Sequence, residues 1–222
     1  MRTIFSTFDF KNADLAMEER NYADNHVRLA KQLPGLRLYL TGLVAKHAQH
    51  PTPHRAVFLS FDDADALKAG VRKSPVAKPL ADDGAAHIVN NRWFELESEV
   101  IVPFESKRPG LRCFVMAAQF DLKLDGSNIA AAEKRYLEHH TQLARRLPGL
   151  RHYMIGKFAD AVGMRPEFAA TPDRFRMAML VFDSVEALRD AYRSPAGQAL
   201  VQDEDATIAN ARVYRLDATV QV

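Results

Sequence analysis

The sequence of 222 residues contains a single cysteine, Cys113, so no disulfide can form within the chain. A lone cysteine fits a reducing compartment and is typical of a cytoplasmic protein. Neither sign of charge dominates, since the chain has 30 basic and 28 acidic residues. It also lacks the runs of lysine and arginine that mark nucleic-acid or membrane surfaces. The composition therefore predicts no nucleic-acid partner.

Long hydrophobic runs are also missing, because no apolar segment approaches the roughly 20 residues of a membrane span. Near the start, Asp9 and Lys11 interrupt the chain before an apolar segment of signal-peptide length has formed. We therefore expect a soluble, cytoplasmic protein with no membrane partner. Hydrophobic residues still make up 47% of the chain, which is enough for an ordinary packed core.

One segment of the sequence occurs twice. Residues 33–42 read LPGLRLYLTG, and residues 147–156 read LPGLRHYMIG. Similar residues recur at matching positions through the rest of both halves, which indicates a tandem duplication. The segment between the halves, PFESKRPG, has the prolines and glycine of a connecting loop. We therefore predict two domains, at residues 1–104 and 105–222.

Both halves predict the same order of elements. Alternating patterns indicate strands, spacings of three and four indicate helices, and each Pro-Gly ends a long helix. The order strand, helix, strand, strand, helix, strand predicts an α+β fold of the ferredoxin-like type, an antiparallel sheet with both helices on one face. The expected strands are residues 3–10, 36–45, 55–61 and 87–102 in the first half, and 111–122, 150–159, 174–182 and 207–217 in the second.

Each long helix also has a tyrosine followed four residues later by a histidine, within its apolar stripe. Residues at this spacing lie about one turn apart on one helix face. Another tyrosine follows on the next strand. These residues are our candidate catalytic residues: Tyr22, His26 and Tyr39 in the first half, and Tyr136, His140 and Tyr153 in the second.

The Tyr-x-x-x-His helix followed by the L-P-G-L-R-x-Y strand resembles the EthD family, within the dimeric α+β barrel superfamily. The resemblance covers both halves. It implies that two ferredoxin-like sheets pack face to face as a barrel with the helices outside, and that this chain supplies both domains. Such packing removes the apolar face of each sheet from water. We expect an intramolecular pseudo-dimer, present either as a monomer or as a homodimer.

Two interpretations of the tyrosine and histidine sets stay open. In one, they hydrogen-bond locally and hold helix to sheet. In the other, the imidazole exchanges protons near neutral pH while the phenols stabilise negative charge on a substrate oxygen. The identical spacing in both halves favours function. If one half works alone, we expect it to be the second, where His139 adds a further candidate for substrate binding.

Three further features have simpler interpretations. Arg37 and Arg151 are candidates for binding a substrate carboxylate, although an arginine beside a tight turn is typically a solvated charge. Asn90 and Asn210 alternate with arginines on the last strand of each half, and we expect them to hydrogen-bond across the barrel seam.

The histidines of one loop, His47, His50 and His54, suggest a metal site at first sight. They lack a cysteine or carboxylate in register and have no counterpart in the second half. Neither half has a haem-specific signature. We therefore predict no metal and no cofactor.

A base beside phenols suits removal of a proton from a phenol, or from a carbon next to a carbonyl. The resemblance implies two outcomes of this chemistry, cofactor-free oxidation of an aromatic or polyketide-like compound and isomerisation of a lactone. We expect a cofactor-independent oxidoreductase or oxygenase that acts on a small hydrophobic carbonyl or phenolic substrate. The alternatives are a lactone or ketone isomerase with the same site, and a non-catalytic binding or stress-associated module with structural histidines.

Overall fold

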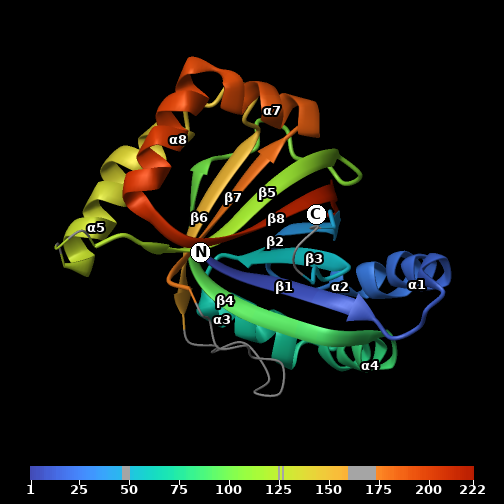
Figure 1. Cartoon of the computed structure of the whole chain (residues 1–222). Helices are drawn as coiled ribbons and strands as arrows, with labels where there is room; N and C mark the ends of the chain where they lie inside the picture. The colour runs from blue at the N-terminus through green and yellow to red at the C-terminus, as the bar shows by residue number, and fades with distance from the viewer. Residues whose placement is uncertain (47–50, 125, 127, 160–173) are drawn as a thin grey trace.

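A computed structural model describes residues 1–46, 51–124, 126, 128–159 and 174–222. Within them, eight strands close one antiparallel barrel in the order β1-β3-β2-β8-β5-β7-β6-β4. Figure 1 shows the helices outside this barrel. The first unit supplies β1 (Arg2–Phe10), β2 (Leu36–Val44), β3 (Arg55–Phe61) and β4 (Ile88–Val102), and the second supplies β5 (Arg112–Leu122), β6 (His152–Ala159), β7 (Arg176–Phe182) and β8 (Ile208–Val220).

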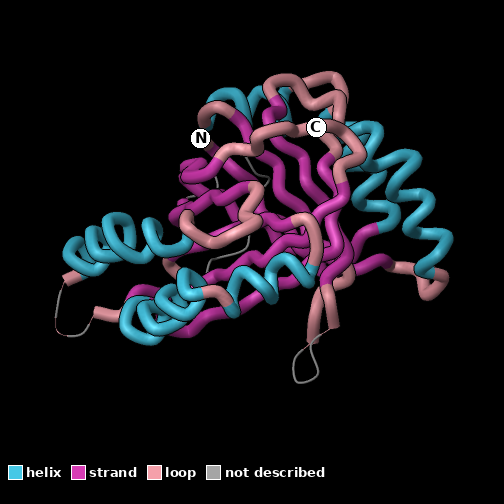
Figure 2. The backbone as a smooth tube through the Cα atoms, turned by 90° about the horizontal axis from the view of Figure 1, so that it is seen from above, coloured by secondary structure: helices cyan, strands magenta, loops and turns pink. Residues whose placement is uncertain are grey.

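The two units carry equivalent helices, which lie at the periphery of the strands in Figure 2. The long helix of each unit has a π-helical segment in its middle, a rare feature that often marks functional sites. The first unit contains α1 (Leu15–Asn21), η1 (Tyr22–Val27), α2 (Arg28–Ala30), α3 (Ala64–Lys68), η2 (Ala69–Lys73) and α4 (Ala77–His87). The second contains α5 (Ile129–Arg135), η3 (Tyr136–His140), α6 (Thr141–Ala144), α7 (Val185–Arg193) and α8 (Pro195–Thr207).

Apolar side chains such as Leu40, Phe58 and Leu216 fill the barrel interior. Small barrels of eight strands are commonly filled in this way. The opposite face of each sheet carries its own apolar cluster, which the helices of that unit cover. The barrel interior is packed, so we expect space for a ligand between the helices and the outer face of each sheet.

Two seams join the units. One is the pairing of β2 with β8 and the other the pairing of β4 with β6. The glycine that ends each repeated segment lies at a seam. A Cβ added at Gly42 would stand 2.6 Å from the backbone oxygen of Asp217, and one at Gly156 would stand 3.1 Å from Cβ of Leu96. The repeated motif thus ends in glycine because the neighbouring strand passes close by.

The α+β architecture and the barrel closed by two ferredoxin-like units are confirmed. The expectation that each Pro-Gly ends its helix is wrong, because the C-caps are Lys31 and Arg145. Gly35 at φ 76° and Gly149 at φ 72° instead lie in the turn between helix and strand, in the left-handed region. The division at residues 104 and 105 stays a prediction. No helix among the described residues is both long and apolar enough to cross a membrane.

The prediction for Asn90 and Asn210 is wrong. Both have φ of 53°, and each amide donates within its own unit. Asn90 Nδ2 lies 3.0 Å from Oδ2 of Asp9, and Asn210 Nδ2 lies 2.9 Å from Oδ2 of Asp121. The strand register shifts next to both aspartates. The asparagines therefore fix a bulge in each unit, since their left-handed backbone turns the side chain toward the neighbouring strand.

Candidate functional site

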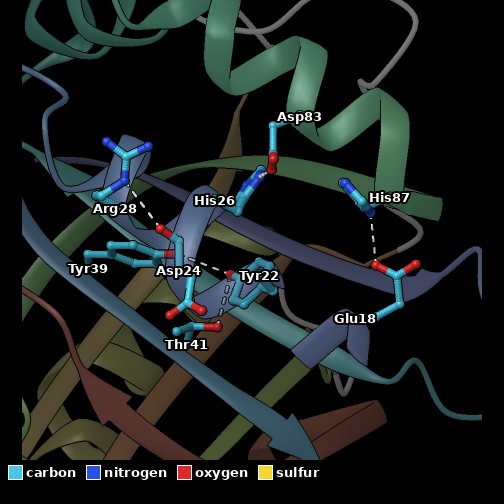
Figure 3. A network of polar contacts seen from close by, with 9 residues as sticks. All are labelled: Glu18, Tyr22, Asp24, His26, Arg28, Tyr39, Thr41, Asp83 and His87. Carbon is cyan, nitrogen blue, oxygen red and sulfur yellow. Dashed lines mark hydrogen bonds and ion pairs between the residues drawn. The ribbon is translucent and has the colours of Figure 1, made fainter. Parts of the chain in front are cut away.

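In the first unit, the predicted tyrosine and histidine belong to a column of stacked side chains. Arg55 Cζ lies 4.6 Å from the centre of the Tyr22 ring, and that ring stacks on His26 with 5.1 Å between centres and an interplanar angle of 17°. His26 Nδ1 lies 2.8 Å from Oδ2 of Asp83 on α4 (Figure 3). Glu19 pairs with Arg55 at the far end. An acid therefore stands at each end of the column.

The second unit repeats this column. Arg176 Cζ lies 5.0 Å from the centre of the Tyr136 ring. The Tyr136 and His140 rings stack 5.3 Å apart at 21°. His140 Nδ1 lies 2.8 Å from Oδ2 of Asp203, and Arg176 pairs with Glu133 at 2.6 Å. The repetition shows that one arrangement serves both units.

The aspartate fixes the state of the imidazole. In the first unit, the hydrogen bond with His26 lowers the pKa of Asp83 below its ordinary value. An ionised carboxylate can only accept, so it holds the proton of His26 on Nδ1 and leaves Nε2 with a free lone pair. In the second unit, burial opposes ionisation of Asp203, but hydrogen bonds from His140 and Thr207 still lower its pKa. Burial also lowers the pKa of His140.

In the first unit, the phenol beside the histidine contacts two other hydroxyl groups. Tyr22 Oη lies 3.1 Å from Oη of Tyr39 and 3.2 Å from Oγ1 of Thr41 (Figure 3). Burial, followed by the influence of Tyr22, raises the pKa of Tyr39 well above its ordinary value. Burial likewise raises the pKa of Tyr153 to about 12. Tyr39 thus supports Tyr22. The raised pKa values of Tyr39 and Tyr153 mean that each phenol can donate a hydrogen bond but cannot act as a base.

A cavity of about 100 Å³ adjoins the first column, between η1 and α4 and the outer face of the sheet. Most of its wall is apolar, and α4 contributes small residues such as Ala81 and Gly84. A Cβ added at Gly84 would stand 3.5 Å from Cε1 of His26, so the small residue keeps this wall close to the imidazole. The side chains with polar atoms are Ser6, Tyr22, His26, Tyr39, Asn91 and Trp93.

The second unit carries larger residues at two equivalent positions. Glu204 follows Asp203 where Gly84 follows Asp83, and Tyr192 stands where the first unit has Val71. Tyr192 packs against the helix-side apolar cluster of its unit. Burial, the charge of Glu204 and the nearby Tyr153 raise the pKa of Tyr192. The second unit therefore carries larger side chains at two positions that line the described cavity of the first. Which half is active stays a prediction.

The two candidate arginines do not line the described cavity. Arg37 Nε lies 2.9 Å from both carboxylate oxygens of Asp62, and Arg151 Nε lies 3.0 Å from both oxygens of Asp183. All four side chains are about half exposed. The arginines therefore tie the start of one strand to the end of its neighbour, which is the simpler of the roles considered above.

The remaining histidines also contact carboxylates. His139 is exposed, with Nε2 3.5 Å from Oδ1 of Asp203, and it reaches the outer side of the second column. His54 Nε2 lies 2.6 Å from Oε1 of Glu19. His47 and His50 lie outside the described residues. The contact of His54 extends the charged end of the first column rather than forming a metal ligand set.

Sequence reasoning missed the acidic ends of both columns. A complete alignment of the two halves would have identified them, because Asp83 precedes Asp203 by the same interval as Ser74 precedes Ser194. The aspartates lie on a helix far from the histidines in sequence, so helical periodicity alone gives no sign of the contact. Repetition between the halves was the available signal.

The cavity also limits which groups could bind. An engineered cavity of about 150 Å³ accepts a single benzene ring, so a haem, which has four pyrrole rings, does not fit a cavity of about 100 Å³.

Comparisons with known proteins agree with this architecture. Residues 128–211 match the EthD domain family, and no curated protein matches the chain. Among solved structures, a candidate monooxygenase from Fusobacterium nucleatum subsp. nucleatum has a TM-score of 0.71 at 8% identity, with 99% of this chain and 93% of that chain covered.

Two other similar structures cover nearly the whole chain. A candidate monooxygenase from Lactobacillus acidophilus has a TM-score of 0.67 at 15% identity, with 100% of this chain and 97% of that chain covered. An anthrone oxidase-like protein has a TM-score of 0.59 at 16% identity, with 99% and 90% covered. At such identities the likeness is one of fold.

Proposed function

We propose that this protein, a dimeric α+β barrel with an EthD domain at residues 128–211, is a cofactor-independent enzyme of oxidase or oxygenase type. Its substrate is a small hydrophobic carbonyl or phenolic compound, and its setting is the cytoplasm. The reaction takes place in the cavity of the first unit. The observation that carries this proposal is the His26–Asp83 pair, which supplies an oriented base at the wall of an apolar cavity.

His26 Nε2 takes a proton from a phenol, or from a carbon next to a carbonyl. Asp83 stabilises the imidazolium that results, because its carboxylate accepts the Nδ1 hydrogen bond at 2.8 Å. The hydroxyl of Tyr22 lies in the same wall and can donate toward the oxygen that gains negative charge. The apolar surroundings strengthen both interactions because water is excluded.

The anion formed in this way reacts with dioxygen as the oxidant. The substrate carbon that has lost its proton adds dioxygen and forms a peroxide. The O–O bond then breaks as the second C–H proton leaves the same carbon. A methylene group and dioxygen thus become a ketone and water, with the electrons of two C–H bonds reducing dioxygen. The protein contributes the base, the orientation and the exclusion of water.

The size of the cavity narrows the substrate class. An engineered cavity of about 150 Å³ holds one benzene ring, so a cavity of about 100 Å³ favours a compound no larger than about one ring. Most ligand pockets have about 300 to 1,000 Å³, so a polycyclic substrate would require α4 to move away from the sheet. One-ring phenols and small cyclic ketones are therefore the first compounds to test.

The chain contains a matched control for the proposed base. We expect His26→Gln to lower oxygen uptake with the active compound by about 10² to 10⁴-fold, in chelator-treated buffer. His140→Gln changes the same column in the other unit, which carries the larger residues, and should leave the rate within about threefold. An equal loss of oxygen uptake in both variants would show that the two histidines stabilise the fold and do not act as the base.

The same experiment distinguishes the alternatives. Substrate that rearranges without oxygen uptake would indicate isomerisation at the same base. Binding without turnover of any compound would indicate a non-catalytic module and would contradict the proposed chemistry.

A further inference from the structure

A polar pair lies in the sheet wall of the cavity. Ser6 on β1 is buried, and its Oγ donates to Oδ1 of Asn91 on β4 at 2.9 Å. Both residues line the cavity, as does His26 on η1. The pair therefore belongs to the sheet wall, while the proposed base belongs to the helix wall. An otherwise apolar space has hydrogen-bonding groups on two walls.

The second unit shows that the fold does not need this pair. Ser6 pairs with Trp93 in the strand register, and Ala118 pairs with Val213 in the equivalent register of the second unit. In the second unit, Ala118 therefore stands at the position of Ser6. Ala211 stands at the position of Asn91, because each of these two residues directly follows the bulge asparagine of its unit. The second unit therefore has the same strand pairing, bulge and stacked column with alanine at both positions of the pair.

The pair is present in the unit whose α4 leaves a cavity and is missing from the unit that carries Tyr192 and Glu204. This coincidence indicates a ligand rather than a structural requirement. A structural requirement would act on both sheets alike, because their pairing and register are the same. A requirement for ligand binding would act only where a ligand has room.

We infer that Ser6 and Asn91 form the binding site for the oxygen atom of a carbonyl or phenolic ligand. The hydroxyl of Ser6 donates a hydrogen bond to Oδ1 of Asn91 and so fixes the orientation of the amide. The Nδ2 group then carries two N–H donors, which suit an oxygen acceptor. Ser6 is a positioning residue, and Asn91 is the residue that contacts the ligand. This inference deepens the proposed function and rests on it for the identity of the ligand.

The arrangement also orients the substrate. A carbonyl ligand whose oxygen binds at the sheet wall presents the carbon next to the carbonyl to the helix wall, where His26 lies. A site built to hydrogen-bond an oxygen rejects an analogue that lacks it, because the buried donors are then left unpaired. The protein should therefore discriminate against hydrocarbons of the same shape.

The test compares phenol with toluene, a ring of similar size without the oxygen, by ligand-observed NMR titration of the full chain. We expect the wild type to bind phenol about tenfold more tightly than toluene. The double variant Ser6→Ala with Asn91→Ala recreates the pair found in the second unit and should lose this preference. His26→Gln should keep it. A double variant that retains the preference would overturn the inference.

A second variant distinguishes loss of ligand binding from loss of the folded structure. Asn91→Asp keeps the size of the side chain and the acceptor for Ser6 but replaces the two donors with a carboxylate oxygen. It should bind cyclohexanone, whose oxygen can only accept a hydrogen bond, no better than methylcyclohexane, whereas the wild type should prefer the ketone. Circular dichroism confirms the fold. A preserved preference in this variant would again overturn the inference. A preference for phenol in the wild type without any turnover would contradict the proposed function and leave the binding site intact.

Discussion

Asp83 Oδ2 lies 2.8 Å from Nδ1 of His26, although the two residues belong to different helices and lie 57 positions apart in sequence. The same distance separates Asp203 from His140. The duplicated contact gives each histidine one defined tautomer. In each unit the contact also joins the π-helical segment of the long helix to the helix that carries the aspartate.

Replacement of Asp83 by asparagine should impair catalysis more than binding. The introduced amide could donate as well as accept, so the preference of His26 for a proton on Nδ1 would be lost. We expect kcat to fall by about 10² to 10⁴-fold while KM changes little. Steady-state oxygen uptake measures both. Asp203→Asn is the control, and a comparable fall in that variant would contradict the assignment of activity to the first unit.

Exchange of the small residues around the cavity should close it. The double variant Val71→Tyr with Gly84→Glu introduces the residues that the second unit carries at these positions. We expect binding of phenol to fall below detection while the fold is kept, because the second unit accommodates the same two residues. A crystal structure and an NMR titration would check the result. Unaltered binding would show that the ligand binds elsewhere.

The reverse exchange should open a cavity beside Tyr153. Tyr192→Val with Glu204→Gly removes a large buried ring, at a cost of about 2 to 5 kcal/mol in the free energy of unfolding. Added phenol should recover part of that stability, since a ligand that binds only the folded state stabilises it. Thermal unfolding with and without phenol measures both effects. Destabilisation without recovery would show that the site has collapsed.

A buried histidine outside both columns predicts how stability depends on pH. His152 stacks on Phe104 with 4.3 Å between ring centres, and burial lowers its pKa to about 4. As pH falls from the ordinary histidine pKa toward this value, the unfolded chain binds a proton that the folded chain does not, so stability falls through this window. The total loss is about 3 kcal/mol.

The variant His152→Leu tests this dependence, because Leu38 stands at the same position of the first unit. Urea unfolding at several pH values between neutral and mildly acidic should give a smaller decrease in the free energy of unfolding for the variant than for the wild type. Parallel curves for the two proteins would show that His152 does not set the slope.

The seam glycines should differ in their tolerance of alanine. At Gly42 a Cβ would stand 2.6 Å from the backbone oxygen of Asp217, which cannot move without disturbing the strand pairing. At Gly156 the nearest atom is Cβ of Leu96, at 3.1 Å. We expect Gly42→Ala to lower the free energy of unfolding by about 3 kcal/mol and Gly156→Ala by about 1 kcal/mol. Chemical denaturation measures both changes in the free energy of unfolding. A larger loss in Gly156→Ala than in Gly42→Ala would contradict this expectation.

The sequence predicted the elements well because local rules determine them. Alternation located β3 at Arg55–Phe61, as observed, and the Pro-Gly pairs located the turns in which Gly35 and Gly149 have positive φ. The helix faces also placed Tyr22 and Tyr136 in the interior. Such features depend on a few neighbouring residues, which the sequence displays directly.

The site was predicted only in part, because its other half comes from distant segments. The contact of Asp83 with His26 depends on how α4 packs on η1, which no local pattern records. The cavity depends on residues that are small, such as Gly84, and a missing side chain gives no motif. The prediction that the second half is active relied on His139, which is exposed, and it stays a prediction.

The two seams also affect how the protein responds to dilution. In a barrel assembled from separate chains, strand pairs such as β2 with β8 would form by association, and the folded fraction would depend on protein concentration. Here both partners belong to one chain, so closure is unimolecular, and the effective concentration of one unit around the other is fixed by the connection. The cavity and its column should therefore persist at nanomolar concentrations, at which a weakly associated pair of chains would have separated.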